Sequence, residues 1–483
     1  ADPDTTEDDG LWKLMVKGLP DDPFMPLHLA QAWGLVEPHH NYWLDRAGYA
    51  SGDGWSEEHR EELDALLAQA AEDEGREPTF PDRAVISIDA PTTRDVDDAF
   101  FIEARPEGGW NLTLALACPA YRWPFGGKLD KAVFSRATSI YLPEATHHML
   151  PETLGTEAYS LLAGRTRPSM LVECVVGADG LVVSCRPRLG FAKLAANLCY
   201  EDCEAALEGG ESPASPYLEQ LRQALALAEL HQRRRIENGA VIIERPDLNI
   251  TLEGTGEDVT VSLSEDAPAP KAHLLVSELM VLTNAALAAW AKEHGVTLLH
   301  RTQDVAIPKE FAGIWKAPLD VARVVRALAP AVLETGPKPH AGLGEPLYAP
   351  STSPLRRYPD MINETQIIAT LREGKPRWSR EELDALLPLL NAHLDAAGQV
   401  QRFRPRYWKL LYFRQQGDRW WPAVITDEND AFVTVNMPKE QMVVRARRQF
   451  FGERTHPGQE LEIRLGKVHP LHNDFQLVET REI

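Results

Sequence analysis

Four aspartates stand close together in the segment DAPTTRDVDD: Asp89, Asp95, Asp97 and Asp98. Carboxylates at this spacing repel one another in water, and hard divalent cations such as Mg2+ are the usual occupants of oxygen-only sites. Paired cations about 4 Å apart clamp the attacking and leaving oxygens of a phosphodiester. The segment therefore predicts a metal site for phosphoryl chemistry.

The flanking residues indicate that this segment is a turn at the end of a strand. Apolar residues alternate over 84–88, and Phe100-Phe101-Ile102 suggest a second buried strand. The alternative is a solvated loop whose aspartates bond the local backbone. An EF-hand calcium loop is excluded, because the place that needs Gly, counted from Asp95, is Phe100, and no Glu stands at the twelfth place.

The segment also resembles a known signature. Ser87-Ile88-Asp89 followed by Asp95-Val96-Asp97-Asp98-Ala99 is similar to the signature of the ribonuclease II (RNB) family. Any one motif is weak, but the joint order and spacing of several make the resemblance strong, and it covers about residues 85 to 408. The other motifs are KLDK at 128–131, SIYLP at 139–143, MLP at 149–151, LCY at 198–200, ERPD at 244–247, SELM at 277–280 with Asn284, and Tyr348 with TSPLRRYPDM at 352–361.

The resemblance implies a role for each aspartate. Asp89, Asp95 and Asp98 would chiefly hold Mg2+, for which Mn2+ can substitute, and Asp97 would support the site and the attacking water. Nothing in the sequence supplies a protein nucleophile.

Two arginines are candidate phosphate ligands. Arg356 and Arg357 follow a Ser-Pro turn, and a guanidinium can grip a phosphate through two parallel hydrogen bonds. By resemblance, Arg356 grips the terminal phosphate and stabilises charge that develops on the phosphoryl group. The alternative is a surface pair of arginines that caps Asp360.

Three further residues are predicted to bind RNA. By resemblance, Glu278 helps to orient the 3′ terminal nucleotide, Tyr141 stacks on bases and Tyr200 contacts the scissile end. Stacking holds single strands with little sequence preference. The alternatives are a Glu at the edge of the apolar helical stripe over 273–282, and tyrosines that only pack.

Two departures from the family pattern bear on RNA binding. Relatives usually carry an aromatic residue just before the segment matching Glu244, where this chain has Val241-Ile242-Ile243. Stacking there would be weaker, which leaves the final product length open. Many relatives also carry a Glu shortly before the residue that matches Trp408, a contact that is lost here or replaced by Gln401.

Composition is that of a soluble globular protein. The chain has 483 residues, 44% of them hydrophobic, and its length suggests about three domains. No uninterrupted apolar run is long enough for a membrane helix, and the start ADPDTTEDDG is unlike a signal peptide. We expect a cytoplasmic monomer without membrane contact. The five cysteines form no CxxC pair, so we expect them to be reduced and structural.

The net charge of -22 is unusual for a protein that binds nucleic acid, because phosphate binding draws on clustered Lys and Arg. Its distribution resolves part of this conflict. Residues 1–80 hold 19 acidic and 5 basic side chains, whereas 401–483 hold 14 basic and 11 acidic ones. We therefore expect RNA to contact the centre and the C-terminal part rather than the front.

The two ends of the chain differ in pattern. Residues 27–33 and 56–67 read as helices, the second with Ser56 at its N-cap. This favours a small helical or winged-helix-like domain over 1–80, in which 41–54 reads as a hairpin wing; the alternative is a purely structural cap. From 409 to 483, short strands predict an S1-like OB-fold barrel, on which Arg445 and Arg447 would bind RNA beside aromatic residues or else solvate an edge strand.

Together these features predict an α+β multidomain protein with an RNB-type catalytic domain over 81–408. The expected function is a 3′ to 5′ exoribonuclease that hydrolyses single-stranded RNA to nucleoside 5′-monophosphates. The alternatives are a catalytically decayed RNA-binding regulator and another metal-dependent nuclease.

Overall fold

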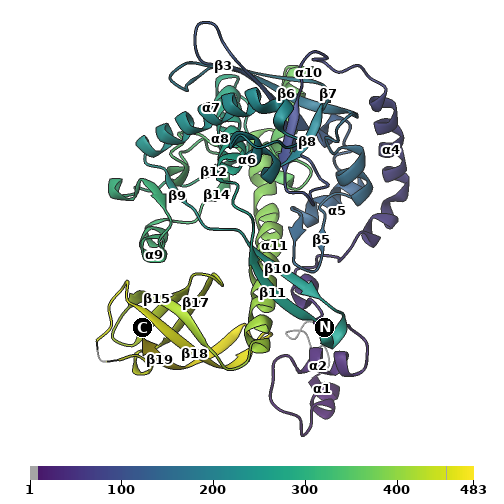
Figure 1. Ribbon diagram of the computed structural model, residues 1–483. Coiled ribbons are helices and arrows are strands. Elements are labelled where there is room, and N and C mark those ends of the chain that lie inside the picture. The colour runs from purple at the N-terminus through teal and green to yellow at the C-terminus, as the bar shows by residue number, and fades with distance from the viewer. Residues whose placement is uncertain (1–8, 453) are drawn as a thin grey trace.

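The molecule is organised along one long helix, α11 (Arg380–Gln415), which begins at a capping box between Ser379 and Glu382. The computed structural model describes residues 9–452 and 454–483. A large α+β body packs against one face of the first half of α11, and a small curled β-sheet and a group of short helices flank its other half (Figure 1). The α+β multidomain architecture is as predicted.

The body is built on a six-stranded sheet in the order β7-β6-β3-β2-β1-β8. Strand β1 pairs antiparallel with β2 and parallel with β8, so it lies inside the sheet. The other neighbours are antiparallel. The strands are β1 (Ile86–Asp89), β2 (Asp98–Ala104), β3 (Trp110–Ala117), β6 (Thr166–Val176), β7 (Val182–Lys193) and β8 (Ala196–Cys199).

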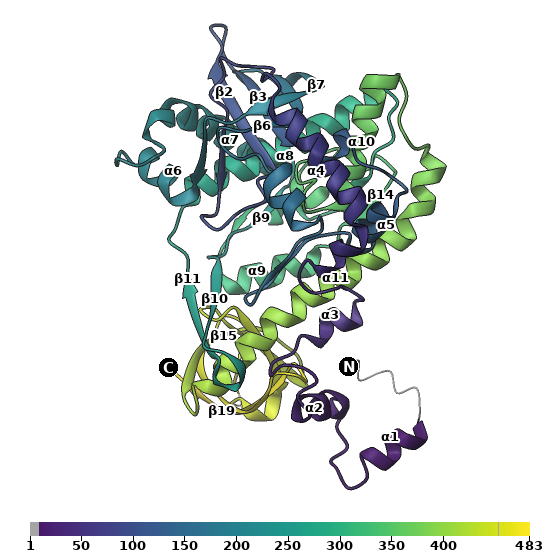
Figure 2. The same cartoon turned by 90° about the vertical axis from the view of Figure 1, so that its right-hand side faces the viewer.

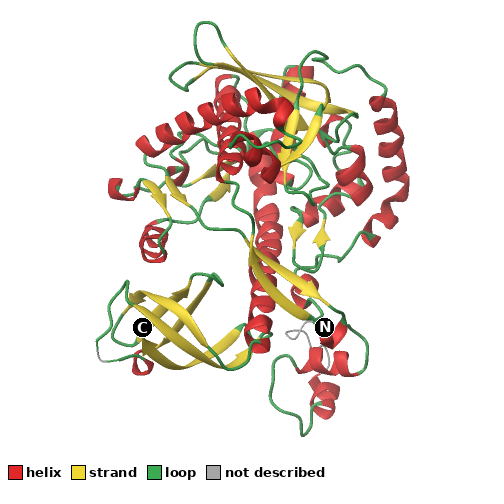
Figure 3. Cartoon of the chain, viewed as in Figure 1, coloured by secondary structure: helices red, strands yellow, loops and turns green. Residues whose placement is uncertain are grey.

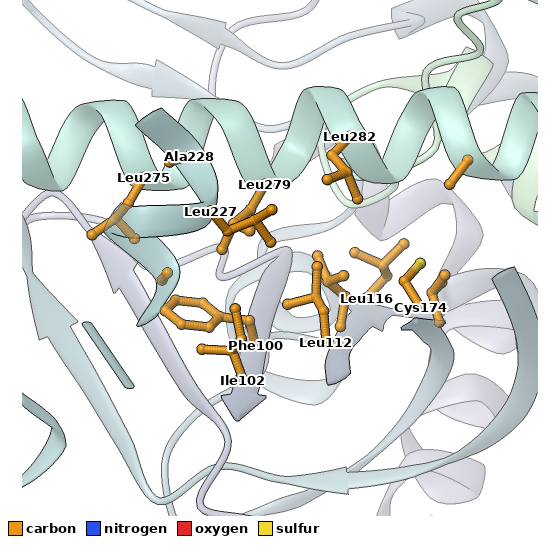
Figure 4. Packing of buried hydrophobic residues seen from close by; sticks show 14 of the residues in the cluster. Phe100, Ile102, Leu112, Leu116, Cys174, Leu227, Ala228, Leu275, Leu279 and Leu282 are labelled. Carbon is orange, nitrogen blue, oxygen red and sulfur yellow. The ribbon is translucent and has the colours of Figure 1, made fainter. Parts of the chain in front are cut away.

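Two helices, α7 (Leu218–Glu237) and α8 (Pro270–Glu293), cover one face of this sheet. Figure 4 shows Phe100 and Leu112 of the sheet facing Leu279 of α8. Each large apolar side chain buried in this way contributes about 1.5–3 kcal/mol. Among the described residues, α8 alone is long and apolar enough to cross a membrane, and 61% of its most apolar window is buried. Packing in the core accounts for that hydropathy.

The other face is covered by α4 (Arg60–Glu74), α5 (Lys128–Arg136), α10 (Tyr358–Glu373) and the first half of α11. Leu63 and Leu66 of α4 share one core with Val96, which lies in the acidic segment. Helix α4 therefore packs on the body, although its sequence belongs to the acidic front segment.

In the described part of the front segment, helices alternate with loops, and no strand is assigned before β1 (Figure 3). It contains α1 (Asp9–Met15), α2 (Met25–Ala32) and α3 (Tyr42–Arg46). Helix α1 lies away from the body, whereas α3 packs against α11 (Figure 2). The predicted wing over 41–54 is wrong, because the aromatic run turns as a helix and buries Tyr42 and Trp43. Ser56 is no N-cap either, since a 3-10 helix (Gly54–His59) precedes α4.

The C-terminal part is a curled five-stranded sheet in the order β17-β16-β15-β18-β19, consistent with the predicted OB-fold. Its core includes Leu410 and Phe413 from the end of α11. The helix thus runs through the predicted boundary at 408/409, and the sheet begins at Trp420. The strands are β15 (Trp420–Glu428), β16 (Phe432–Met437), β17 (Met442–Arg447), β18 (Glu460–His469) and β19 (Asp474–Glu482).

Smaller elements connect these parts. The pairs that matter below are the hairpin of β4 (Ile140–Tyr141) and β5 (Thr146–His147), and the parallel pair of β9 (Val241–Ile243) and β13 (Gly313–Trp315). The others are β10 (Leu248–Glu253), β11 (Thr260–Glu265), β12 (His300–Thr302), β14 (Val332–Glu334), α6 (Tyr200–Leu207) and α9 (Pro318–Ala327).

Candidate active site

The four aspartates lie where the sequence places them, between two paired strands. Asp89 is the last residue of β1 and Asp98 is the first residue of β2. Asp95 and Asp97 lie in the connecting segment and are 7% and 3% exposed. The strand pairing and the buried Val96 hold this segment against the core, so it is not the solvated loop of the alternative interpretation.

Asp97 joins this segment to a second one, far away in the sequence. Its Oδ1 accepts a hydrogen bond of 2.8 Å from the Leu355 amide, and its Oδ2 accepts one of 2.9 Å from Arg356 Nε. The guanidinium also donates from Nη2 to Ser353 Oγ, yet 43% of the Arg356 side chain is exposed. Arg356 is therefore fixed in place while it can still present N–H groups to an anion.

Asp360 shapes the turn that carries Arg356. This carboxylate is fully buried, and its Oδ1 accepts hydrogen bonds from the Ser353 amide at 3.0 Å and from Arg357 Nη2 at 2.6 Å. Arg357 therefore does pair with Asp360, as in the alternative interpretation, whereas Arg356 does not. The sequence motif contains Asp360, but only the structure reveals that it holds both ends of this turn.

Asp95 is bonded to the β4–β5 hairpin. Its Oδ2 accepts a hydrogen bond from the Tyr141 hydroxyl and lies 3.7 Å from His148 Nδ1. Burial acts to raise the pKa of Asp95, but the nearby His148 imidazole and the hydrogen bond from Tyr141 outweigh it and lower the pKa below the usual value. Tyr141 is 42% exposed, so the residue can be reached by a base. His148 was not predicted, and no spacing signal points to it.

The other carboxylates are held in an unfavourable environment. Burial raises the pKa of Asp89 to about 6, and burial together with the charge of Asp89 raises the pKa of Asp98 to about 7. Burial raises the pKa of Asp97 well above its usual range, although Arg356 opposes this shift. Asp89 Oδ2 is buried without a hydrogen-bond partner. These groups carry repulsion that a bound cation would relieve.

The residues fit a divalent cation. Mg2+ is often held by one or two carboxylates, with waters and substrate phosphates completing its shell. Asp89 and Asp98 offer such a pair, and one Asp89 oxygen lacks a protein donor. In the part of the chain that the structure describes, no group of three or more His, Cys, Asp or Glu side chains is arranged around one ion position. The role of Asp95 as a further ligand stays a prediction.

Two predicted RNA contacts are engaged within the protein. The Tyr200 ring stacks on His273 of α8, with ring centroids 3.9 Å apart. Glu278 is 3% exposed, bonds His231 Nδ1 at 2.7 Å and pairs with Arg235. The structure thus places Glu278 in a buried network that joins α7 to α8, and contacts of Glu278 and Tyr200 with RNA stay predictions.

The predicted residues of the barrel lie apart from the aspartates. Arg445 and Arg447 are exposed on β17, and the Arg445 guanidinium lies 4.5 Å from the centroid of the Phe432 ring. This combination of cation and ring suits a nucleic acid.

Comparison with known proteins agrees with the geometry. The model of the RNB domain family matches residues 79–373, which is more than half of the chain. The chain belongs to the RNB domain family. Exoribonuclease 2 of Klebsiella pneumoniae is 31% identical over 327 residues, which cover 59% of this chain and 50% of that protein. The chain spans about half the length of the curated relatives it matches.

Solved structures share the RNB fold. Mycoplasma genitalium RNase R in complex with ribose methylated single-stranded RNA has a TM-score of 0.71 and 18% identity, over 86% of this chain and 75% of that one. Yeast Ssd1, a pseudonuclease, has a TM-score of 0.63 and 15% identity, over 85% of this chain and 54% of that one. These likenesses show the fold alone, so the site residues must distinguish a nuclease from a binding protein.

Proposed function

We propose that this RNB protein is a 3′ to 5′ exoribonuclease that hydrolyses single-stranded RNA to nucleoside 5′-monophosphates with the help of a divalent cation. The observation that carries the proposal is the Asp97–Arg356 pair. It sets a guanidinium beside the half-buried carboxylates of Asp89 and Asp98 before any substrate is present. A site with buried anions and a fixed, half-exposed cation suits phosphoryl transfer.

The acidic residues would provide the metal site. Asp89 and Asp98 would hold Mg2+ or Mn2+, with Asp95 as the predicted further ligand. When bound, the cation would polarise the phosphate and lower the pKa of the attacking water. Asp97 keeps the Arg356 guanidinium oriented and accepts a hydrogen bond from the Leu355 amide. These two contacts fix the turn that carries Arg356 against the acidic segment.

Arg356 would act directly on the substrate. Its Nε is bound by Asp97, and the nearby carboxylates raise its pKa above the usual value, so it stays protonated at any working pH. A positive group held beside the scissile phosphate stabilises the negative charge that develops on the phosphoryl oxygens. Because Arg356 is already oriented, little reorganisation accompanies the reaction.

Tyr141 supports the choice of a single-stranded substrate. Its hydroxyl binds Asp95, so the ring of this exposed residue is fixed next to the acidic segment. A base that stacks on this ring would be held next to the carboxylates, and stacking of this kind suits unpaired strands. The proposal for RNA over DNA rests on the family, since contacts to the ribose 2′-hydroxyl decide that choice.

End-labelled oligonucleotides test this function. RNA and DNA of one sequence are incubated with Mg2+, with Mn2+ or with EDTA, and the products are resolved by length. The proposal requires mononucleotides released from the 3′ end of RNA, dependence on the cation and little cleavage of DNA. A ladder of internal fragments would instead identify an endonuclease. Equal cleavage of DNA and RNA would contradict the proposed selectivity for ribose.

A second candidate is an RNA-binding protein that does not hydrolyse RNA. It is favoured by one observation, that a pseudonuclease shares this fold. The presence of all four aspartates together with Arg356 argues against it. Tight RNA binding without any mononucleotide release, with either cation supplied, would establish this second function.

A further inference from the structure

Three cations gather where the barrel meets the body, apart from the candidate active site. Arg245 lies in the connection between β9 and β10, and Arg406 and Lys409 lie one turn apart on α11. We call these three residues the junction cluster. The turn before β17 joins them, because Gln441 Nε2 donates to the Pro246 carbonyl at 2.6 Å and Lys409 Nζ donates to the Gln441 carbonyl at 3.4 Å.

The charges of the junction cluster are poorly compensated. Within the described parts of the chain, none of its three members forms an ion pair, although the protein carries a net charge of -22. Burial, followed by the charges of Arg406 and Arg245, lowers the pKa of Lys409 to about 8. The nearby acids are Asp474 and Glu440, and burial raises the pKa of Glu440. Like charges held together without an ion-pair partner indicate a binding site for an anion.

The surroundings favour a nucleic-acid backbone as this anion. Strand β17 begins directly after Gln441 and carries the exposed Arg445 and Arg447. The neighbouring strand β9 offers only the aliphatic side chains of 241–243, and Trp315 on its partner β13 is held by a hydrogen bond from its Nε1 to the Phe311 carbonyl. A strand passing here would therefore be held through its phosphates.

We propose that the junction cluster binds backbone phosphates of single-stranded RNA upstream of the end held at Asp89–Asp98. It gives longer strands extra affinity, because only a strand that reaches from the active site to the junction contacts it. This inference rests on the proposed function, which places the 3′ end at the aspartates. Near β9, electrostatic contacts with phosphates would then hold the strand in place of base stacking.

The test compares RNAs of increasing length. Binding of oligoadenylates from about 4 to about 16 nucleotides is measured with the full chain in EDTA, so that the readout does not depend on hydrolysis. The variants are Arg245→Gln, Lys409→Gln and the pair, with Arg222→Gln on the exposed side of α7 as the matched control. Arg406 is left unchanged because it contacts Asn473 and Met442.

The double variant should bind the longest strand about tenfold more weakly. The slope of log affinity against log salt should become less steep by about 1.4, because each lost phosphate contact removes about 0.7. The shortest strand and the control should be unaffected. An equal loss for short and long strands, or no loss for long ones, would overturn the proposal. Arg245 is exposed, so its single variant is informative even if substitution of Lys409 impairs folding. Length-dependent binding in EDTA, together with no mononucleotide release when Mg2+ or Mn2+ is supplied, would contradict the proposed function while leaving the junction cluster in place.

Discussion

The acidic segment and the junction cluster differ in how far their charges are paired within the protein. At the acidic segment, Asp97 is almost fully buried and already paired with Arg356. At the junction, Arg245 and Lys409 have hydrogen bonds or solvent around them but no described ion pair. A site whose charges are oriented in advance favours chemistry, whereas uncompensated charges favour capture of a ligand. Changes at the first should therefore alter turnover, and changes at the second should alter affinity.

The largest effect is expected for Asp97→Asn. The amide keeps a hydrogen-bond acceptor for Leu355 but loses the charge that orients Arg356, so kcat should fall at least about hundredfold while RNA binding is retained. Single-turnover hydrolysis and equilibrium binding measure the two properties. Asp395→Asn, on the exposed side of α11, is the matched control. Unchanged turnover in the Asp97 variant would remove these carboxylates from the mechanism.

Asp360→Asn should separate positioning from binding. Loss of the charge weakens the bond to Arg357 and loosens the turn, so kcat should fall about tenfold or more with little change in KM. The free energy of unfolding should also fall by about 1–3 kcal/mol, because a buried partner is left unsatisfied. Steady-state kinetics and urea unfolding supply the readouts. Reduced stability with normal kcat would mean that Asp360 is only structural.

Tyr141→Ala should weaken binding of short RNA by about tenfold, since loss of one stacked base costs about 1–3 kcal/mol. Tyr141→Phe keeps the ring and removes only the hydroxyl that binds Asp95, so it should bind short RNA almost as the unchanged protein does. Fluorescence anisotropy with a labelled tetranucleotide compares them. If both variants lost the same affinity, the hydroxyl rather than the ring would be responsible.

The smallest effect is a pH dependence at the junction. Lys409 is protonated below its pKa of about 8 and loses its charge as the pH rises through that value. Affinity for long RNA should therefore fall a few-fold, about threefold, between neutral and alkaline pH, and Lys409→Arg should abolish this fall. The neighbouring Arg245 and Arg406 stay charged throughout, and Glu440 stays ionised at alkaline pH. A pH profile that is the same in both proteins would assign the titration to another group.

The local sequence pattern predicted the positions of helices and strands better than it predicted how these elements pack. The alternation around 84–88 and the spacing of the aspartates predicted a turn between two strands, and the structure contains that turn. The wing over 41–54 failed because Tyr42 and Trp43 read as strand residues locally. They form α3 instead because a helix lets them pack against α11. Tertiary contacts of this kind override weak local preferences.

The sequence by itself determined the family, the acidic segment and the types of residue that can bind metal and phosphate, because these depend on spacing along the chain. The tertiary structure decided which partners meet. Asp97 and Arg356 are separated by 259 positions and join only when α10 packs on the sheet, and the junction cluster draws on the β9–β10 connection, α11 and the barrel. Such contacts are fixed by how faces bury one another, which no local spacing encodes.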